Sequence, residues 1–265
     1  MPSPRNAKLV VALDFQTADE ALALARTLAP LAAPGQPELW MKVGLELFVA
    51  QGPEVVRELK RLGFKVFLDL KFLDIPNTVR GAVRSAVKSG ADMLNIHAAG
   101  GMDMARAAVA ARDEAYLECG GEAVLGAKPL LFAVTVLTSM QDADTPILQG
   151  RPAAEVALEL ARATREAGLD GVVCSGHEAA RIKQACGQEF LCLTPGIRVP
   201  EPNAPADDQR RVMTPEAAVA AGSDYLVVGR PITRAPQDKG GPVASAREIL
   251  RRMSQASALP AQAGR

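Results

Sequence analysis

The sequence lacks most features of metal-binding, disulfide-bonded or membrane-embedded proteins. Its four cysteines form no CxxC pair, and its two histidines, His97 and His177, are too few and too far apart to suggest a metal site. No segment approaches the roughly 18 uncharged apolar residues of a membrane helix. The first residues pass directly into a strand-like run, without the apolar stretch of a secretory signal. We therefore expect a cytoplasmic protein with reduced thiols.

The chain also lacks an excess of charge of either sign. Lysine plus arginine and aspartate plus glutamate each number 30. This balance gives no general attraction to nucleic acid or acidic membranes, so we expect neither as a partner. With 48% hydrophobic residues among 265, the chain can bury a large core. Any effect of charge on function must therefore be local.

Short apolar runs rich in β-branched residues alternate with helical stretches along the whole chain, which is typical of parallel βα units. Eight strands are expected, at 9–15, 39–45, 65–73, 92–98, 130–137, 171–175, 191–196 and 225–229. The α/β pattern predicts one (β/α)8 (TIM) barrel domain over residues 1–265. The competing doubly wound open sheet usually has GxGxxG after its first strand, where this chain reads LDFQTADEA.

Two segments depart from the regular βα pattern. Residues 113–129 predict a longer connection with room for an extra helix, and the tail from about residue 254 has the composition of a frayed end. Neither segment carries a chemical motif. We therefore look for function among the strand ends.

The third expected strand, KVFLDLKF, carries two charges in an apolar run. Strict alternation places Phe67, Asp69 and Lys71 on one face of the strand. The other face is apolar and consists of Val66, Leu68, Leu70 and Phe72. In a closed barrel the charged face points inward, at the carboxyl end where barrel active sites lie. The alternative is a solvated edge strand with a weak surface ion pair.

The two preceding strands each contribute one isolated charge, Asp14 and Lys42. Together with Asp69 and Lys71 they form four charges of alternating sign at similar depth, a pattern that favours a network able to orient lysines and shift pKa values. Asp74 follows three residues after Lys71. Thr78 could cap the next helix.

The last two units have features of a phosphate site. The seventh strand leads into TPGIR, with Arg198, and then into a polar loop that contains Gln209; the eighth ends at Gly229 and Arg230. Glycine permits close approach of the backbone, and arginine offers a planar fork to phosphate oxygens. Barrels often bind phosphate at these two loops.

With these motifs in place, the sequence closely resembles the orotidine 5'-phosphate decarboxylase family, bacterial type. The resemblance spans nearly the whole chain and rests on VALDF (11–15), MKVGLELF (41–48), FLDLKFLDIPNTV (67–79), VTVLTS (134–139), DGVVCSGHEA (170–179), TPGIR (194–198), DQRRVMTPEAA (208–218) and VVGRPIT (227–233). It implies a homodimeric carboxy-lyase that forms UMP from orotidine 5'-phosphate in de novo pyrimidine biosynthesis.

The resemblance also implies roles for individual residues. Lys71 would donate the proton to C6, within an array of Lys42, Asp69 and an Asp74 contributed by the partner subunit; Thr78 would also reach across the dimer. The substrate contacts would be Asp14 and Lys42 at the ribose, Thr138 and Ser139 at the pyrimidine, and Gln209, Gly229 and Arg230 at the phosphate, with Arg198 beside them. No metal or organic cofactor is implied. Leu73 stands where many bacterial relatives have histidine, and we expect little effect on chemistry.

Two other functions remain open. A Mg²⁺-dependent phosphosugar decarboxylase or aldolase of the same barrel group would use Asp69 to help hold the metal. A non-catalytic sensor of a phosphorylated ligand could keep the barrel, although the intact set Lys42, Asp69, Lys71 and Asp74 argues against it. A chelation assay would separate the first from a metal-free decarboxylase.

Overall fold

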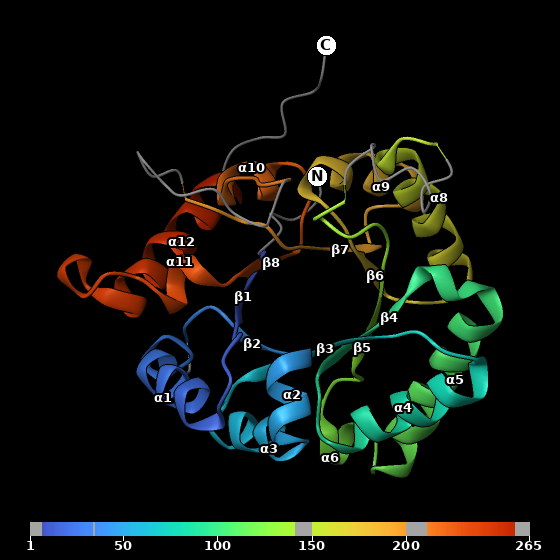
Figure 1. Ribbon diagram of the computed structural model, residues 1–265, viewed down its shortest axis with the longest axis horizontal. Helices are drawn as coiled ribbons and strands as arrows, with labels where there is room; N and C mark the ends of the chain where they lie inside the picture. The colour runs from blue at the N-terminus through green and yellow to red at the C-terminus, as the bar shows by residue number, and fades with distance from the viewer. Residues whose placement is uncertain (1–6, 34, 141–149, 200–210, 258–265) are drawn as a thin grey trace.

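The computed structural model describes residues 7–33, 35–140, 150–199 and 211–257. Eight parallel strands, β1 to β8, close into one barrel in chain order, and the helices lie around it (Figure 1). The predicted (β/α)8 barrel is confirmed.

The observed strands end earlier than expected, because the chain leaves the sheet to form the loops of the cavity described below. The strands are β1 Lys8–Ala12, β2 Leu39–Gly44, β3 Lys65–Phe72, β4 Met93–His97, β5 Leu130–Val134, β6 Gly171–Val173, β7 Leu191–Thr194 and β8 Tyr225–Val228. The α-helices are α1 Ala18–Leu28, α2 Leu45–Gln51, α3 Glu54–Arg61, α4 Pro76–Lys88, α5 Gly101–Glu118, α6 Glu122–Leu125, α8 Ala153–Glu166, α9 Gly176–Cys186, α10 Pro215–Ala220, α11 Arg230–Thr233 and α12 Gly241–Ser257.

Alternation along the strands produces two apolar layers. Inward side chains fill the barrel, where Trp40 makes an edge-to-face contact with Tyr225 at a centroid distance of 5.4 Å. Outward side chains such as Val66 and Leu68 pack under the helices in a larger cluster. Trp40 is therefore a core residue. The packed interior leaves the carboxyl ends of the strands as the place for a cavity.

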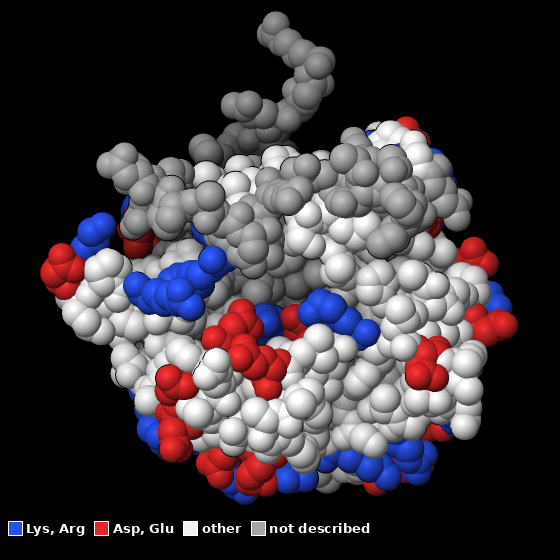
Figure 2. Space-filling model, in the orientation of Figure 1, with Lys and Arg blue, Asp and Glu red and all other residues white. Residues whose placement is uncertain are grey.

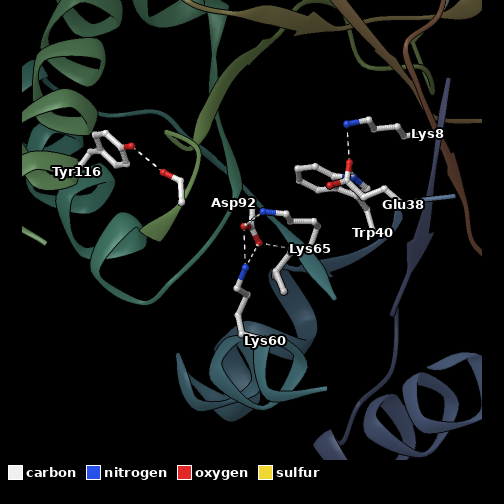
Figure 3. Close-up of polar contacts among 9 residues, drawn as sticks. Lys8, Glu38, Trp40, Lys60, Lys65, Asp92 and Tyr116 are labelled. Atoms are coloured by element: carbon white, nitrogen blue, oxygen red, sulfur yellow. Dashed lines mark hydrogen bonds and ion pairs between the residues drawn. The ribbon is translucent and has the colours of Figure 1, made fainter. Parts of the chain in front are cut away.

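The amino end of the barrel is fastened by three aspartates that precede even-numbered strands. Asp92, before β4, accepts hydrogen bonds from Val66 N–H of β3 at 2.8 Å and from Lys60 and Lys65 (Figure 3). The same arrangement recurs at Asp170, with Leu131 N–H and Arg112, and at Asp224, with Cys192 N–H and Lys183. We call these three groups the base clamps. Each joins two strands and a neighbouring cation, and so fixes strand register below the cavity.

The two irregular segments differ from expectation in detail. Helix α5 continues to Glu118, so the first part of 113–129 is helical, and the short α6 is the extra helix. Tyr116 of α5 donates to the carbonyl of Gly126 and closes this excursion (Figure 3). Helix α12 continues to Ser257 and buries Met253 and Ala256, so the first residues of the tail that was expected to fray are helical. The rest of that tail, residues 258–265, lies outside the described residues.

Candidate active site

A cavity of about 490 Å³ opens at the carboxyl ends of the strands. In the view of Figure 2, acidic and basic side chains lie along the lower edge of a hollow near the centre of the molecule. The cavity is lined by nine of the predicted site residues: Asp14, Lys42, Asp69, Lys71, Thr138, Ser139, Arg198, Gly229 and Arg230. These nine residues therefore lie together at the carboxyl end of the barrel, where the strand pattern placed the site.

The four charges form a continuous chain of contacts from Asp14, two residues after β1, through Lys42 of β2 to Asp69 and Lys71 of β3. Lys42 Nζ lies 2.9 Å from Asp14 Oδ1 and 3.4 Å from Asp69 Oδ2. Lys71 Nζ lies 2.6 Å from Asp69 Oδ1. We call Asp14, Lys42, Asp69 and Lys71 the mouth array. The order of its contacts is acid, base, acid, base, as the alternating signs predicted.

The array keeps its buried members ionised. Burial alone would lower the pKa of Lys42, but the charges of Asp69 and Asp14 outweigh it and raise that pKa above its ordinary value. Burial would likewise raise the pKa of Asp69, but the charges of Lys42 and Lys71 hold it below its ordinary value. The side chain of Lys71 is 31% exposed, against 11% for Lys42. Lys71 is thus the lysine of the array that is more open to the cavity.

The array is built on an irregular stretch of β3. Leu68 pairs with Leu94 of β4, but the next pair is Phe72 with Ile96, so β3 carries two more residues than β4 between these pairs. Lys71 lies in this bulge with a φ of 51°, the one non-glycine residue with positive φ in the part of the chain described. Such a backbone is strained for a lysine, and strained backbones cluster at functional sites.

The loops after β7 and β8 hold the predicted phosphate residues. Arg198 follows β7, while Gly229 and Arg230 lie at the start of α11. A Cβ added at Gly229 would lie 3.6 Å from Ala12 Cβ and 3.8 Å from Asp14 Oδ2. The backbone there closely approaches the β1 side of the mouth. Gln209, also predicted for the phosphate, lies outside the described residues.

Asp74 and Thr78 are placed away from this chain's own cavity. Both are exposed and neither lines it. Asp74 Oδ1 accepts a hydrogen bond from Ile75 N–H at 2.7 Å. The possible capping role of Thr78 is wrong, because α4 starts at Pro76 with Ile75 as its N-cap and Thr78 lies within the first turn. Leu73 is outward, as expected, and 55% exposed.

Sequence reasoning missed several residues of the mouth. Glu46, Thr233 and Arg234 also line the cavity. The sequence carried a signal for them: Glu46 lies in the first turn of the helix after β2, and Thr233 and Arg234 end the short helix that begins at Arg230. Arg234 adds another guanidinium to the wall that holds Arg198 and Arg230.

A second missed group supports the β5 end of the cavity. Arg211 donates to the carboxylate of Glu178 and to the carbonyls of Val136 and Leu137, just before Thr138. Burial raises the pKa of Glu178 even though the charge of Arg211 opposes the shift. Arg211 therefore joins the segment after β5 to the first turn of α9.

The described residues contain no group of three or more histidine, cysteine or acidic side chains that could hold a metal ion. Within the same ranges, no helix is long and apolar enough to cross a membrane. His97 is half-buried, and its Nδ1 accepts a hydrogen bond from Ala99 N–H at 3.3 Å, whereas His177 is exposed. Cys174, Cys186 and Cys192 are buried.

Comparison with known proteins places these features in a family. A family model described as "Orotidine 5'-phosphate decarboxylase / HUMPS family" matches residues 7–249. Proteins named orotidine 5'-phosphate decarboxylase are similar: one from Nitratidesulfovibrio vulgaris (strain DSM 19637 / Miyazaki F) is 58% identical, covering 93% of this chain and 98% of the relative. One from Maridesulfovibrio salexigens is 52% identical, covering 93% and 99%.

Solved structures agree with these sequence matches. The crystal structure of orotidine 5'-phosphate decarboxylase from Lactobacillus acidophilus has a TM-score of 0.73 and 35% identity, covering 93% of this chain and 99% of that one. An uncharacterized conserved protein from Geobacillus kaustophilus has the same TM-score with 37% identity, covering 92% and 99%.

Proposed function

Because the chain belongs to the orotidine 5'-phosphate decarboxylase / HUMPS family, we propose that it decarboxylates orotidine 5'-phosphate to UMP at the mouth array. The observation that carries the assignment is the ion-paired Lys42, Asp69 and Lys71 inside a cavity that Arg198 and Arg230 also line. The relatives at 52–58% identity carry the same activity in their names. The reaction makes the chain a carboxy-lyase of pyrimidine biosynthesis.

Lys71 is the acid of this reaction. Loss of CO2 from C6 leaves an electron pair on a vinylic carbon with no conjugated sink, so the barrier is electrostatic in origin. A fixed cation beside C6 stabilises that developing charge without reorganisation, and its proton then completes the C–H bond. Lys71 suits both roles because it is held 2.6 Å from Asp69 and remains open to the cavity.

Asp69 orients Lys71 and lies on the side of the array where the substrate carboxylate would sit. Proximity of two anions disfavours the bound ground state, and departure of CO2 relieves that repulsion. Asp14 and Lys42 contact the ribose hydroxyls, and Thr138 with Ser139 contacts the pyrimidine. These assignments place the reacting bond over Lys71.

The phosphate wall supplies binding energy far from the reacting carbon. Arg230 and Arg198 offer guanidinium donors, Gly229 allows the backbone to approach, and Gln209 adds a side-chain amide. Energy from such remote contacts is used to organise the site for reaction. No metal or organic cofactor takes part in this scheme, and the site is cytoplasmic.

The protein acts as a homodimer with shared sites. Four large apolar side chains are exposed near the rim of the mouth: Leu45 is 53%, Val49 82%, Leu73 55% and Ile75 67% exposed. Asp74 stands between the last two of these in sequence. Burial of this patch against a second copy would bring Asp74 and Thr78 to the partner's array, which fits their distance from this chain's own cavity.

The reaction is tested by following the absorbance of orotidine 5'-phosphate with the purified protein, in the presence and absence of a metal chelator. We expect loss of the substrate signal at the same rate in both. A rate abolished by the chelator and restored by Mg²⁺ would favour the phosphosugar type of chemistry. Binding without any turnover would favour the sensor.

Mixing two inactive variants tests the shared site. If Asp74 serves the partner, Lys71→Ala and Asp74→Ala dimers that exchange subunits form heterodimers with one intact site. Random exchange then restores about a quarter of the wild-type activity, because half the dimers are mixed and each carries one working site. If the mixture stays inactive although exchange is demonstrated, Asp74 acts within its own chain.

A further inference from the structure

Asn95 links the two reacting members of the mouth array from the neighbouring strand. It is fully buried in β4. Its Nδ2 donates to Asp69 Oδ1 at 2.8 Å, and its Oδ1 accepts from Lys71 N–H at 2.8 Å. We propose that Asn95 is a positioning residue that sets the geometry of the Asp69 and Lys71 pair. This inference rests on the roles proposed above for that pair.

The bulge in β3 explains why a side chain is needed at this point. Between the pairs Leu68 with Leu94 and Phe72 with Ile96, β3 has three residues and β4 has Asn95 alone. The regular backbone ladder is interrupted there, and the N–H of Lys71 would otherwise lack a strand partner. The amide of Asn95 replaces the missing backbone acceptor and holds Lys71 in its positive-φ conformation.

The same amide fixes the carboxylate of Asp69. Oδ1 of Asp69 receives both Asn95 Nδ2 and Lys71 Nζ, while Oδ2 faces Lys42 Nζ at 3.4 Å. Both lysines reach Asp69 on long flexible stems, whereas the amide of Asn95 is short and buried. Asn95 is therefore the rigid contact of the three. Without Asn95, Lys71 and Asp69 would be positioned mainly by each other, and neither would be fixed to the barrel at this point.

The charge environment makes this role measurable. Lys42 and Lys71 face Asp69 directly, Asp14 lies behind Lys42, and His97 is the titratable side chain of β4 near Lys71. The hydrogen bond from Asn95 is one of the contacts that hold the pKa of Asp69 low. Removing this donor makes Asp69 easier to protonate, so the acid limb of kcat/KM moves to higher pH.

The test uses Asn95→Leu, which is nearly isosteric and removes both hydrogen bonds, and Asn95→Asp, which keeps an acceptor for Lys71 N–H. In Asn95→Leu we expect kcat to fall by about 10- to 100-fold, because small displacements of a reacting group have costs of this size. KM should change by less than about threefold, since the phosphate wall is untouched. The acid limb of the pH profile of kcat/KM should move to higher pH.

Ser223→Ala is the matched control. Ser223 is 1% exposed, lies at the amino end of β8, and shares a buried hydrogen bond of 2.7 Å with Thr194. It should lower the thermal midpoint without changing kcat or the pH profile. If Asn95→Leu does not fold, Asn95→Asp carries the test, with the same readouts.

The inference is overturned if the folded Asn95 variant keeps kcat within twofold of wild type and the same acid limb, while Lys71→Ala is inactive. A fall in kcat that matches the control at equal loss of stability would also overturn it, since the role would then be structural. If Lys71→Ala were itself fully active, the proposed function would fail first, and the two failures are thus distinguishable.

Discussion

Buried charges occupy both ends of the barrel, but their surroundings differ. At the amino end, each aspartate of the base clamps accepts a strand N–H as well as a lysine or arginine. At the carboxyl end, the donors to Asp69 among the described residues are side chains, and Asp69 lines a cavity. The same residue types therefore fix strand register at one end and, in the proposed function, carry out the chemistry at the other, where barrel active sites lie.

Exposure separates two of the three base clamps from the mouth array. The side chains of Lys183 and Arg112 are 3% exposed, whereas those of Lys60 and Lys65 at Asp92 are 33% and 34% exposed. Lys71 in the mouth array is 31% exposed. A cation with all its partners in the protein stabilises the fold, whereas one held on a single side and open on the other can act on a substrate. The following substitutions test whether charges at the amino end affect mainly stability and charges at the carboxyl end mainly activity.

The largest of these effects is expected for Asp69→Asn. It leaves the size of the side chain unchanged but removes the anion that holds Lys71 and Lys42. We expect kcat/KM to fall by about 10²- to 10³-fold, as for loss of one preorganised electrostatic group. Unfolding in urea should change less than for a base-clamp variant. A folded variant with near-wild-type activity would contradict the division between the two ends.

Asp92→Ala should give the opposite pattern. It leaves Val66 N–H without its acceptor and removes the partner of Lys60 and Lys65. These lysines are about one-third exposed and can turn to water, so we expect a loss of about 2–3 kcal/mol in the free energy of unfolding. Turnover at a temperature where the variant is folded should stay within twofold of wild type. Asp92→Asn, which keeps an acceptor, should lose less.

The smallest effect is expected on the helical surface. Arg80 and Glu114 pair between α4 and α5, with side chains 41% and 46% exposed. Glu114→Gln should lower the free energy of unfolding by less than about 0.5 kcal/mol, because exposed pairs are weak and screened. Thermal unfolding at low and high salt would check it. A loss as large as that of Asp92→Ala would show that exposure does not distinguish the ion pairs.

Alternation along strands was sufficient to predict the barrel and most of the mouth array. A charge in or next to a buried apolar strand is costly unless it is paired or faces a cavity. Asp14, Lys42 and Asp69 could therefore be placed at the mouth of the barrel from the sequence. Gly229 and Arg230 in the last unit were predicted to bind phosphate; the structure places both at the cavity, and their role stays a prediction. The family resemblance added the reaction.

Features that depend on departures from regular geometry could not be predicted. Asn95 looks like an ordinary buried polar residue until the two-residue bulge in β3 places it opposite Lys71. The base-clamp aspartates lie at strand starts, where the sequence resembles any turn, and their partners are far away in the chain. A shared site is a property of two chains, so the roles of Asp74 and Thr78 stay predictions.

The most direct test of the account is the turnover of Lys71→Ala, measured together with its affinity for UMP and its thermal midpoint. We predict that kcat falls by at least about 10³-fold, that UMP affinity stays within about threefold because the phosphate wall is intact, and that the protein remains folded. Full activity in a folded Lys71→Ala protein would contradict the account.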